Sequence, residues 1–303
     1  MNQVSHTAAH SGMALWAVLI TSSFYAAAEV TGSVDPIFLT ALRLAFSAVL
    51  FLPLVFLRGE ASLSRSHLAG HAWLGLLLAV YFASLFEALR HTSVVTTALL
   101  FTLVPLMTLG IELRLIPSAN SRGRIMPMLM GASGAALLII GRAGHVVVSE
   151  PYPILVYAAG CLAMAVYSPL SQWLKKDSLR QRSPVGMTFW NMLFGAVFLL
   201  GYTFYDGGWR TAALLDVADI GWLFYLALFA TLGTFWLLHR ATASIAPATV
   251  ISYIYLSTLI TTACHWFWFK QTPVILEITG ALMVGFGMFA LFQVGKRRGS
   301  AAA

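Results

Sequence analysis

Long uncharged runs, broken by polar residues at helical spacing, dominate the pattern of this chain. The run from Thr92 to Ile111 carries no charged residue and is long enough to cross a bilayer core. One stripe of that predicted helix carries, four residues apart, Ser93, Thr97, Phe101 and Pro105. A proline inside a membrane helix frees a backbone carbonyl, which is tolerated where neighbouring groups or a cavity satisfy it. The pattern therefore predicts a helix that faces a pathway.

A second run late in the chain, 245–269, repeats this pattern. Its polar stripe, again four residues apart, consists of Thr249, Tyr253, Ser257 and Thr261. The two runs are predicted to be counterparts.

Similar apolar runs predict a polytopic all-α membrane protein with ten transmembrane helices. Of the 303 residues, 59% are hydrophobic and 10% charged, whereas soluble domains carry roughly 25% charged residues. The short polar lead before residue 12 lacks the basic residues of a secretory signal, so we expect the first span to be retained. The predicted spans are 12–30, 36–57, 69–88, 92–112, 125–142, 153–173, 185–204, 219–238, 246–268 and 273–295.

The basic residues fall mainly on one side of this topology. The other side receives only Arg90, Arg142, Arg210 and Lys270. Because cytoplasmic loops of membrane proteins are enriched in Lys and Arg, the asymmetry predicts that both termini lie in the cytoplasm. It also explains the net charge of +7 without a nucleic-acid partner. The enriched side carries Arg58, Arg65, Arg114, Arg122, Arg124, Lys175, Lys176, Arg180, Arg182, Arg240, Lys296, Arg297 and Arg298.

The matching fourth and ninth spans predict two halves of five spans each, 1–147 and 148–303, within one membrane unit. Because five is odd, the second half must enter the membrane from the other side, which gives inverted repeats. The fifth and tenth spans are both rich in glycine, which lets helices approach closely, so we expect them to be packing elements. Those glycines are Gly131, Gly134, Gly141, Gly280, Gly285 and Gly287.

Several short motifs resemble the drug/metabolite transporter superfamily in its ten-helix EamA-type branch. They are Ala14-Leu15-Trp16, Pro36 with Ala41-Leu42-Arg43, and the stretch from Leu89 to Ser93 before Leu103-Val104-Pro105. Within that branch the chain looks most like the YddG-type exporters of aromatic amino acids. The resemblance implies a bundle of two inverted five-helix repeats, a central cavity and alternating access in the bacterial inner membrane. The chain departs from the family pattern at Leu256-Ser257-Thr258, where a second Leu-x-Pro is usual, and at Gly110-Ile111-Glu112.

Enzymatic motifs are lacking in the sequence. It contains no zincin pattern, no Gly-x-Ser-x-Gly elbow and no phosphate-binding loop, so we expect neither an enzyme nor a metal or cofactor site. Cys161 and Cys264 both lie in apolar segments, where buried inert thiols are expected.

Arg43 is the basic residue predicted to lie deepest in the membrane, roughly 10 Å inside the second span. A charge at that depth costs about 2.5 kcal/mol or more, so it needs a partner or water. We predict a structural ion pair with Glu277, or else with Glu87. The alternative is that Arg43 attracts the carboxylate of a substrate.

Ten residues are candidates for substrate binding. Deep tyrosine and tryptophan side chains need hydrogen-bond partners, which a wet cavity would supply, and short polar groups at mid-depth would add to it. Helix packing and interhelical hydrogen bonds are the alternative for each of them. For His239 and His265, near the span ends, interfacial hydrogen bonding is favoured over proton relay. The candidates are Ser22, Tyr81, Thr97, Phe101, Pro105, Tyr167, Trp190, Asn191, Tyr253 and Ser257.

The resulting hypothesis is an exporter of small amphipathic metabolites, with aromatic amino acids favoured. Aromatic faces would stack on the substrate side chain, while polar groups and the half-helix ends near Pro105 would bind its amino and carboxylate groups. No carboxylate is predicted at mid-membrane, so facilitated movement, or coupling through another residue, is more economical than proton antiport through a buried acid. The alternatives are an exporter of organic cations, although the first span offers only Glu29 at its outer end, and a scaffold protein that transports nothing.

Overall fold

The computed structural model describes residues 6–30, 34–62, 64–116, 122–143, 150–176, 179 and 182–301, and these ranges contain helices and no strand. Helices satisfy their own backbone groups, which a bilayer core requires. In chain order they are α1 (His6–Ala28), α2 (Pro36–Leu57), α3 (Arg65–Leu89), α4 (Val94–Phe101), α5 (Val104–Leu115), η1 (Arg122–Arg124), α6 (Ile125–Ala143), α7 (Pro151–Lys176), α8 (Pro184–Asp206), η2 (Gly208–Leu214), α9 (Val217–Tyr225), η3 (Leu226–Gly233), α10 (Thr234–Ala241), α11 (Pro247–Ile251), α12 (Tyr253–Phe267) and α13 (Ile275–Ala301).

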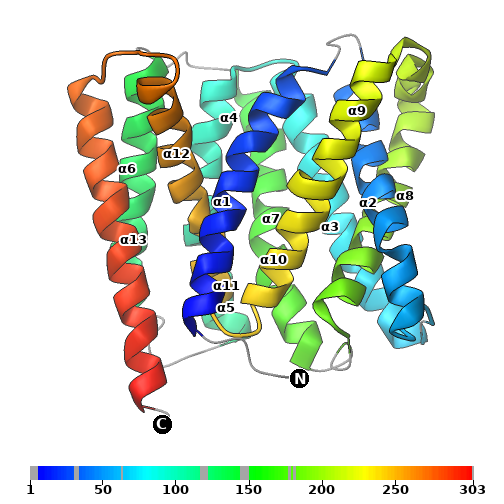
Figure 1. Cartoon of the computed structure of the whole chain (residues 1–303), viewed down its shortest axis with the longest axis horizontal. Coiled ribbons are helices and arrows are strands. Elements are labelled where there is room, and N and C mark those ends of the chain that lie inside the picture. Colours follow the sequence, from blue (N-terminus) through cyan, green and yellow to red (C-terminus); the bar gives the residue numbers. More distant parts are fainter. Residues whose placement is uncertain are drawn as a thin grey trace.

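Nine segments of the described chain are long and apolar enough to cross a membrane, and the first of them is α2. α1 is not among the nine, because polar residues such as His10, Ser22 and Ser23 lower its hydropathy. Its 23 residues nevertheless span about 35 Å, and it runs through the bundle beside the other spans (Figure 1). The described chain therefore has the ten predicted spans, although the first begins at His6, earlier than residue 12.

Three of these spans are interrupted helices. α4 and α5 meet at Thr102 and Leu103, because Pro105 lies in the first turn of α5 and cannot donate a backbone hydrogen bond. α11 and α12 meet at Ser252 without a proline; the Ser252 hydroxyl donates to the Thr249 carbonyl instead, a local bond that bends helices. The third interrupted span, the eighth along the chain, combines α9, the π-helix η3 and α10. Both stripe-bearing spans are thus broken, even where the second proline is missing.

α1 begins and α13 ends at the same end of the bundle (Figure 1). Successive spans alternate in direction, so this end also collects most of the described basic side chains. We call it the basic end; it carries Arg58, Arg65, Arg114, Arg124, Lys175, Arg182 and Arg240. The opposite end carries Arg90, Arg142, Arg210 and Lys270.

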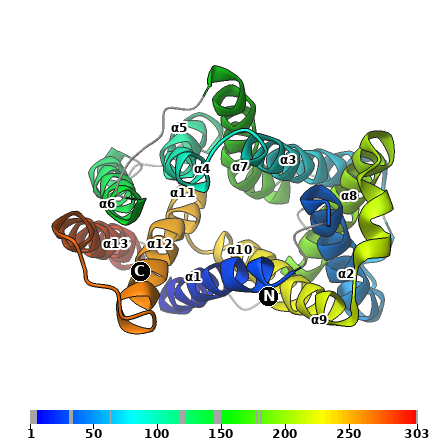
Figure 2. The same cartoon turned by 90° about the horizontal axis from the view of Figure 1, so that it is seen from above.

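Seen from above, the bundle is elongated, and one helix pair lies at each extreme of its long axis (Figure 2). α6 packs against α13 at one end, and α2 packs against α8 at the other. Between these pairs lie α1, α3, α4 with α5, α7, α9 with α10, and α11 with α12. The interrupted spans therefore lie between the two outer pairs.

The prediction that the fifth and tenth spans are packing elements is confirmed, and the structure shows that they pack against each other. A Cβ atom added to Gly134 of α6 would lie 2.7 Å from the carbonyl oxygen of Gly280 in α13. A Cβ atom on Gly287 would lie 2.8 Å from the carbonyl oxygen of Pro127. Only glycine permits such backbone contact, so this pair forms a rigid wall.

Candidate functional site

The ten predicted site residues lie in three groups. Tyr81, Thr97, Phe101 and Pro105 lie on α3 and on the broken span α4–α5. Ser22, Tyr253 and Ser257 lie where α1 meets α12. Tyr167, Trp190 and Asn191 lie on α7 and α8, nearer the basic end.

Three aromatic rings meet beside the break between α4 and α5. The ring centroid of Tyr81 in α3 lies 5.6 Å from that of Phe101 in α4 and 6.3 Å from that of Tyr157 in α7. We call these three residues the aromatic cluster. Their separations are those of favourable aromatic pairs. Tyr157 is buried, whereas Tyr81 and Phe101 are half-buried and keep part of their surface accessible.

The break itself is held by the other broken span. The Tyr255 hydroxyl of α12 donates a 3.1 Å hydrogen bond to the Thr102 carbonyl. The ring of Tyr255 rests on Gly131 of α6, where an added Cβ would lie 2.5 Å from a ring carbon. Tyr255 therefore satisfies an acceptor exposed by the helix break and ties α4 to α12 and α6.

The group between α1 and α12 is engaged in contacts between helices. His10 Nδ1 and the Tyr253 hydroxyl are 2.6 Å apart, and the Thr21 hydroxyl donates to the Ser257 carbonyl at 3.1 Å. Ser22 accepts a 2.9 Å hydrogen bond from the Tyr225 hydroxyl. In this conformation these candidates join helices, which is the alternative interpretation of their polar groups.

A buried chain of polar side chains connects four helices near the basic end. Asn191 Oδ1 lies 2.7 Å from His71 Nδ1, and Asn191 Nδ2 donates to the Tyr167 hydroxyl at 3.0 Å. That hydroxyl lies 3.0 Å from His239 Nε2, and His239 Nδ1 lies 3.4 Å from the Ser171 hydroxyl. None of the five side chains is more than 2% exposed. We call them the histidine network: His71, Tyr167, Ser171, Asn191 and His239.

Trp190 forms its hydrogen bond outside the network that its neighbour Asn191 joins. Its indole Nε1 donates to the Glu60 carbonyl at 3.1 Å, and its ring centroid lies 6.4 Å from that of His71. The tryptophan therefore anchors the connection between α2 and α3 and borders the histidine network.

The predicted ion pair between Arg43 and Glu277 is wrong. α2 and α13 belong to the two outer pairs, which lie on opposite sides of the bundle when it is seen from above, so the two side chains cannot meet (Figure 2). Glu277 instead lies 3.7 Å from Arg142 and accepts from the Trp266 indole at 3.0 Å. Arg43 donates to Thr231 in the π-helix η3 at 3.2 Å, and its buried Nε has no partner.

The other predicted partner of Arg43, Glu87, is also engaged elsewhere. At the opposite end it pairs with Arg90 at 3.1 Å, and Arg90 also contacts Asp35 at 2.9 Å. Partial burial alone would lower the pKa of Arg90, but the carboxylates of Asp35, Glu87 and Asp206 together raise it. These groups join the ends of α2, α3 and α8.

A second, fully buried ion pair lies at the basic end. Glu112 of α5 binds Arg124 through two contacts of 2.5 and 3.1 Å, and both side chains are at most 5% exposed. Glu112 also accepts from the backbone N–H of Ala248, at the start of α11, at 3.0 Å. One carboxylate therefore joins the fourth, fifth and ninth spans, at the position where the motif of the fourth span departs from the usual Gly-Glu.

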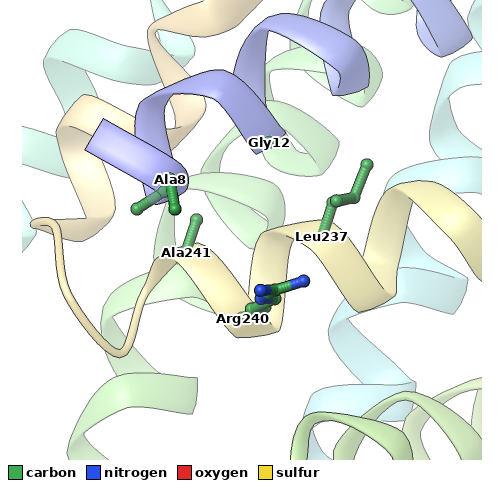
Figure 3. A pocket seen from close by; sticks show the side chains of 6 residues that line it. Ala8, Gly12, Leu237, Arg240 and Ala241 are labelled. Carbon is green, nitrogen blue, oxygen red and sulfur yellow. The ribbon is translucent and has the colours of Figure 1, made fainter. Parts of the chain in front are cut away.

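A small hollow lies between α1 and α10 at the basic end, lined by Ala8, Ala9, Gly12, Leu237, Arg240 and Ala241 (Figure 3). Its volume is about 50 Å³. Sites for small organic ligands are typically about 300–1,000 Å³, so this hollow holds water-sized molecules rather than a metabolite.

Sequence reasoning missed several of these residues. Tyr157, His10 and His71 were not singled out, and His239 was assigned to the membrane interface although it is 1% exposed. The available signal was the position of His71, a turn and a half inside its span, where an imidazole needs a partner. Within the described part of the chain, no group of three or more His, Cys, Asp or Glu side chains is arranged to hold a metal.

Fold and site together define a polytopic membrane protein that consists of one helical bundle with two halves. The model of the EamA-like transporter family matches residues 8–140 and 152–293. The chain therefore belongs to the EamA-like transporter family, whose members are membrane transporters of small molecules and not enzymes. The two matches also confirm the two-repeat architecture.

Structural comparison supports the fold alone. Twenty-eight chains of solved structures match this one. One of them, titled "Crystal structure of protein", has a TM-score of 0.77 and 17% identity, with 97% of this chain and 99% of that chain covered. No curated protein matches the sequence.

Proposed function

We propose that this carrier exports small amphipathic metabolites, and aromatic amino acids in particular, across a bacterial inner membrane. The observation that carries the proposal is the position of the aromatic cluster, at the break between α4 and α5. The side chain of an aromatic amino acid needs an apolar aromatic partner, whereas its ammonium and carboxylate groups need polar partners. The aromatic cluster offers the first and the helix break offers the second, next to each other.

The broken span supplies the polar half of this site. The first turn of α5 has no side-chain cap, so its positive end would attract a carboxylate that reached the break. The Thr102 carbonyl, which accepts one hydrogen bond from Tyr255, has a second lone pair that an ammonium group could use. Tyr81 and Phe101, both half-buried, would stack on the substrate ring.

Alternating access would bring the substrate to this point. The hollow at the basic end is too small for an amino acid, and we expect transport to involve movement of the half 1–147 against the half 148–303. The Lys and Arg asymmetry supports placing the basic end in the cytoplasm. Export then runs from the basic end to the opposite end.

Counterflow of radiolabelled phenylalanine into proteoliposomes that contain the purified protein tests the proposal. We expect uptake above that of empty liposomes, with competition by tryptophan and little by threonine, a nucleotide sugar or an organic cation. Phe101→Ala should raise the half-saturating phenylalanine concentration about tenfold, because a lost aromatic pair costs roughly 1.5 kcal/mol.

The matched control is Phe286→Ala on α13, whose ring is 64% exposed on the outside of the bundle and should leave uptake unchanged. Competition by the cation alone would instead assign the carrier to organic cations, which aromatic rings also attract. If folded protein exchanges none of these compounds, the proposed substrate class is wrong.

A further inference from the structure

The histidine network has one vacant proton position. The Asn191 carbonyl oxygen can only accept, so His71 carries its proton on the facing Nδ1. His71 Nε2 then has a free lone pair, is buried and has no hydrogen-bond partner. At the other end, His239 Nε2 lies 3.0 Å from the Tyr167 hydroxyl and His239 Nδ1 lies 3.4 Å from the Ser171 hydroxyl, so a neutral His239 ring has a partner at both nitrogens in either tautomer. With both rings neutral, these contacts of the network can all be made, and His71 Nε2 is the ring nitrogen of the network that has no partner and can take up a proton.

Positive charges surround this network. Lys175 of α7 acts electrostatically on His239, and Arg182 and His67 act on His71. The carboxylate of Glu60, between α2 and α3, acts on Lys175 and Arg182 and accepts from the Ser183 backbone N–H at 3.3 Å. Among the described contacts, α8 contributes the uncharged amide of Asn191 and the ring of Trp190, and α10 contributes His239 and the ring of Phe235. An imidazolium buried here would lack a counter-ion, so the closed arrangement keeps both rings neutral.

The network also crosses the boundary between the two repeats. His71 lies in the first family match, 8–140, whereas Tyr167, Asn191 and His239 lie in the second, 152–293. If one repeat moves against the other at the basic end, the contact between His71 and Asn191 is broken and water enters. A hydrated imidazole has a pKa of about 6.5 and takes up a proton near neutral pH.

We propose that the histidine network is a proton-binding site that takes up a proton when the basic end opens to water. The inference rests on the proposed carrier mechanism and adds a coupling ion to it. Because the proton binds the open form and is excluded from the closed one, the open form gains population as the pH falls. One histidine that titrates only in the open form shifts the ratio of open to closed protein about tenfold between pH 8 and pH 5.5.

Spin-label distance measurements in lipid nanodiscs test this without any substrate. The labels go on Leu68→Cys in α3 and Ala243→Cys after α10, two exposed sites at the basic end, in a chain with Cys161→Ala and Cys264→Ala. We expect a longer distance whose population relative to the closed one rises about tenfold between pH 8 and pH 5.5.

His71→Gln should weaken this rise, because glutamine keeps a hydrogen-bonding group but cannot titrate, and His239→Gln is made separately in case one variant does not fold. The matched control is His91→Gln, an exposed histidine at the opposite end, which should respond as the parent does. Equal distances at both pH values, or an undiminished rise in folded His71→Gln and His239→Gln, would overturn the proposal. A failure of phenylalanine exchange would refute the substrate class and leave this result standing.

Discussion

Single buried charges in this chain differ sharply in what surrounds them. The carboxylate of Glu112 is 2% exposed and contacts Arg124 as well as the backbone of α11, whereas Glu87 keeps 24% of its side chain exposed beside Arg90. Removing one partner of a buried pair leaves a charge without compensation, whereas an exposed pair contributes little. Burial, rather than the number of contacts, sets the contribution of each pair.

We therefore predict that Glu112→Gln destabilises the protein much more than Glu87→Gln. Loss of the carboxylate charge leaves the buried guanidinium of Arg124 without this counter-charge, at a cost of about 3–5 kcal/mol. The cost for Glu87 is about 0–1 kcal/mol. Thermal unfolding of the two variants in the same detergent measures the difference; equal midpoints would show that the Glu112 pair does not hold the basic end together.

At the scale of elements, the outer pair of α6 and α13 is defined by its glycines, and the interrupted spans by their breaks. Gly134 and Gly280 bring two backbones into contact, so the pair has no room for side chains between its axes. The breaks at Thr102 and Ser252 instead interrupt the helical hydrogen-bond pattern of spans that lie between the outer pairs. A rigid wall beside broken inner helices is the arrangement that lets one part move against another.

Gly134→Ala should destabilise this wall by about 1–3 kcal/mol, because the added methyl group meets the backbone of α13 and no flexible side chain can yield. Gly285→Ala on α13 is the control, since its Cβ meets nothing within 4 Å and alanine favours a helix. Thermal unfolding of both variants decides the matter. A Gly134→Ala protein as stable as the parent would mean that the two helices separate easily.

At the scale of the whole molecule, charge orients the bundle. Basic side chains gather at the end where α1 begins and α13 ends, and far fewer lie at the other. Since translocation of basic loops is disfavoured, we expect this distribution to set how the chain enters the membrane.

We predict that both termini are cytoplasmic. A fluorescent protein that matures only in the cytoplasm should fluoresce when fused after Ala301 and stay dark when inserted after Gln271, in the connection between α12 and α13 at the opposite end. Alkaline phosphatase, active only outside the cytoplasm, should give the reverse pattern at the same two sites. Fluorescence at Gln271 alone would invert the topology and with it the proposed direction of transport.

The sequence by itself determined the class, the ten spans and the two repeats, because a bilayer imposes a fixed length and an apolar surface on every helix. It also predicted the break at Pro105, since a proline acts on its own helix. It predicted that the glycine-rich fifth and tenth spans are packing elements, since small residues on one helix let another helix approach closely. The spans and the break depend on residues within a few turns of the chain, whereas the pairing of α6 with α13 came from the structure.

Only the tertiary structure decided which side chains meet. Arg43 was assigned to Glu277 from their depth in the membrane alone. Depth does not give the position of a helix within the cross-section of the bundle, and α2 and α13 lie on opposite sides of it. His71 and Asn191 are 120 positions apart, and Tyr167 and His239 are 72 apart. Periodicity gives the direction of a side chain around its own helix, whereas contact also requires the position and rotation of the neighbouring helix, which packing of the whole bundle sets.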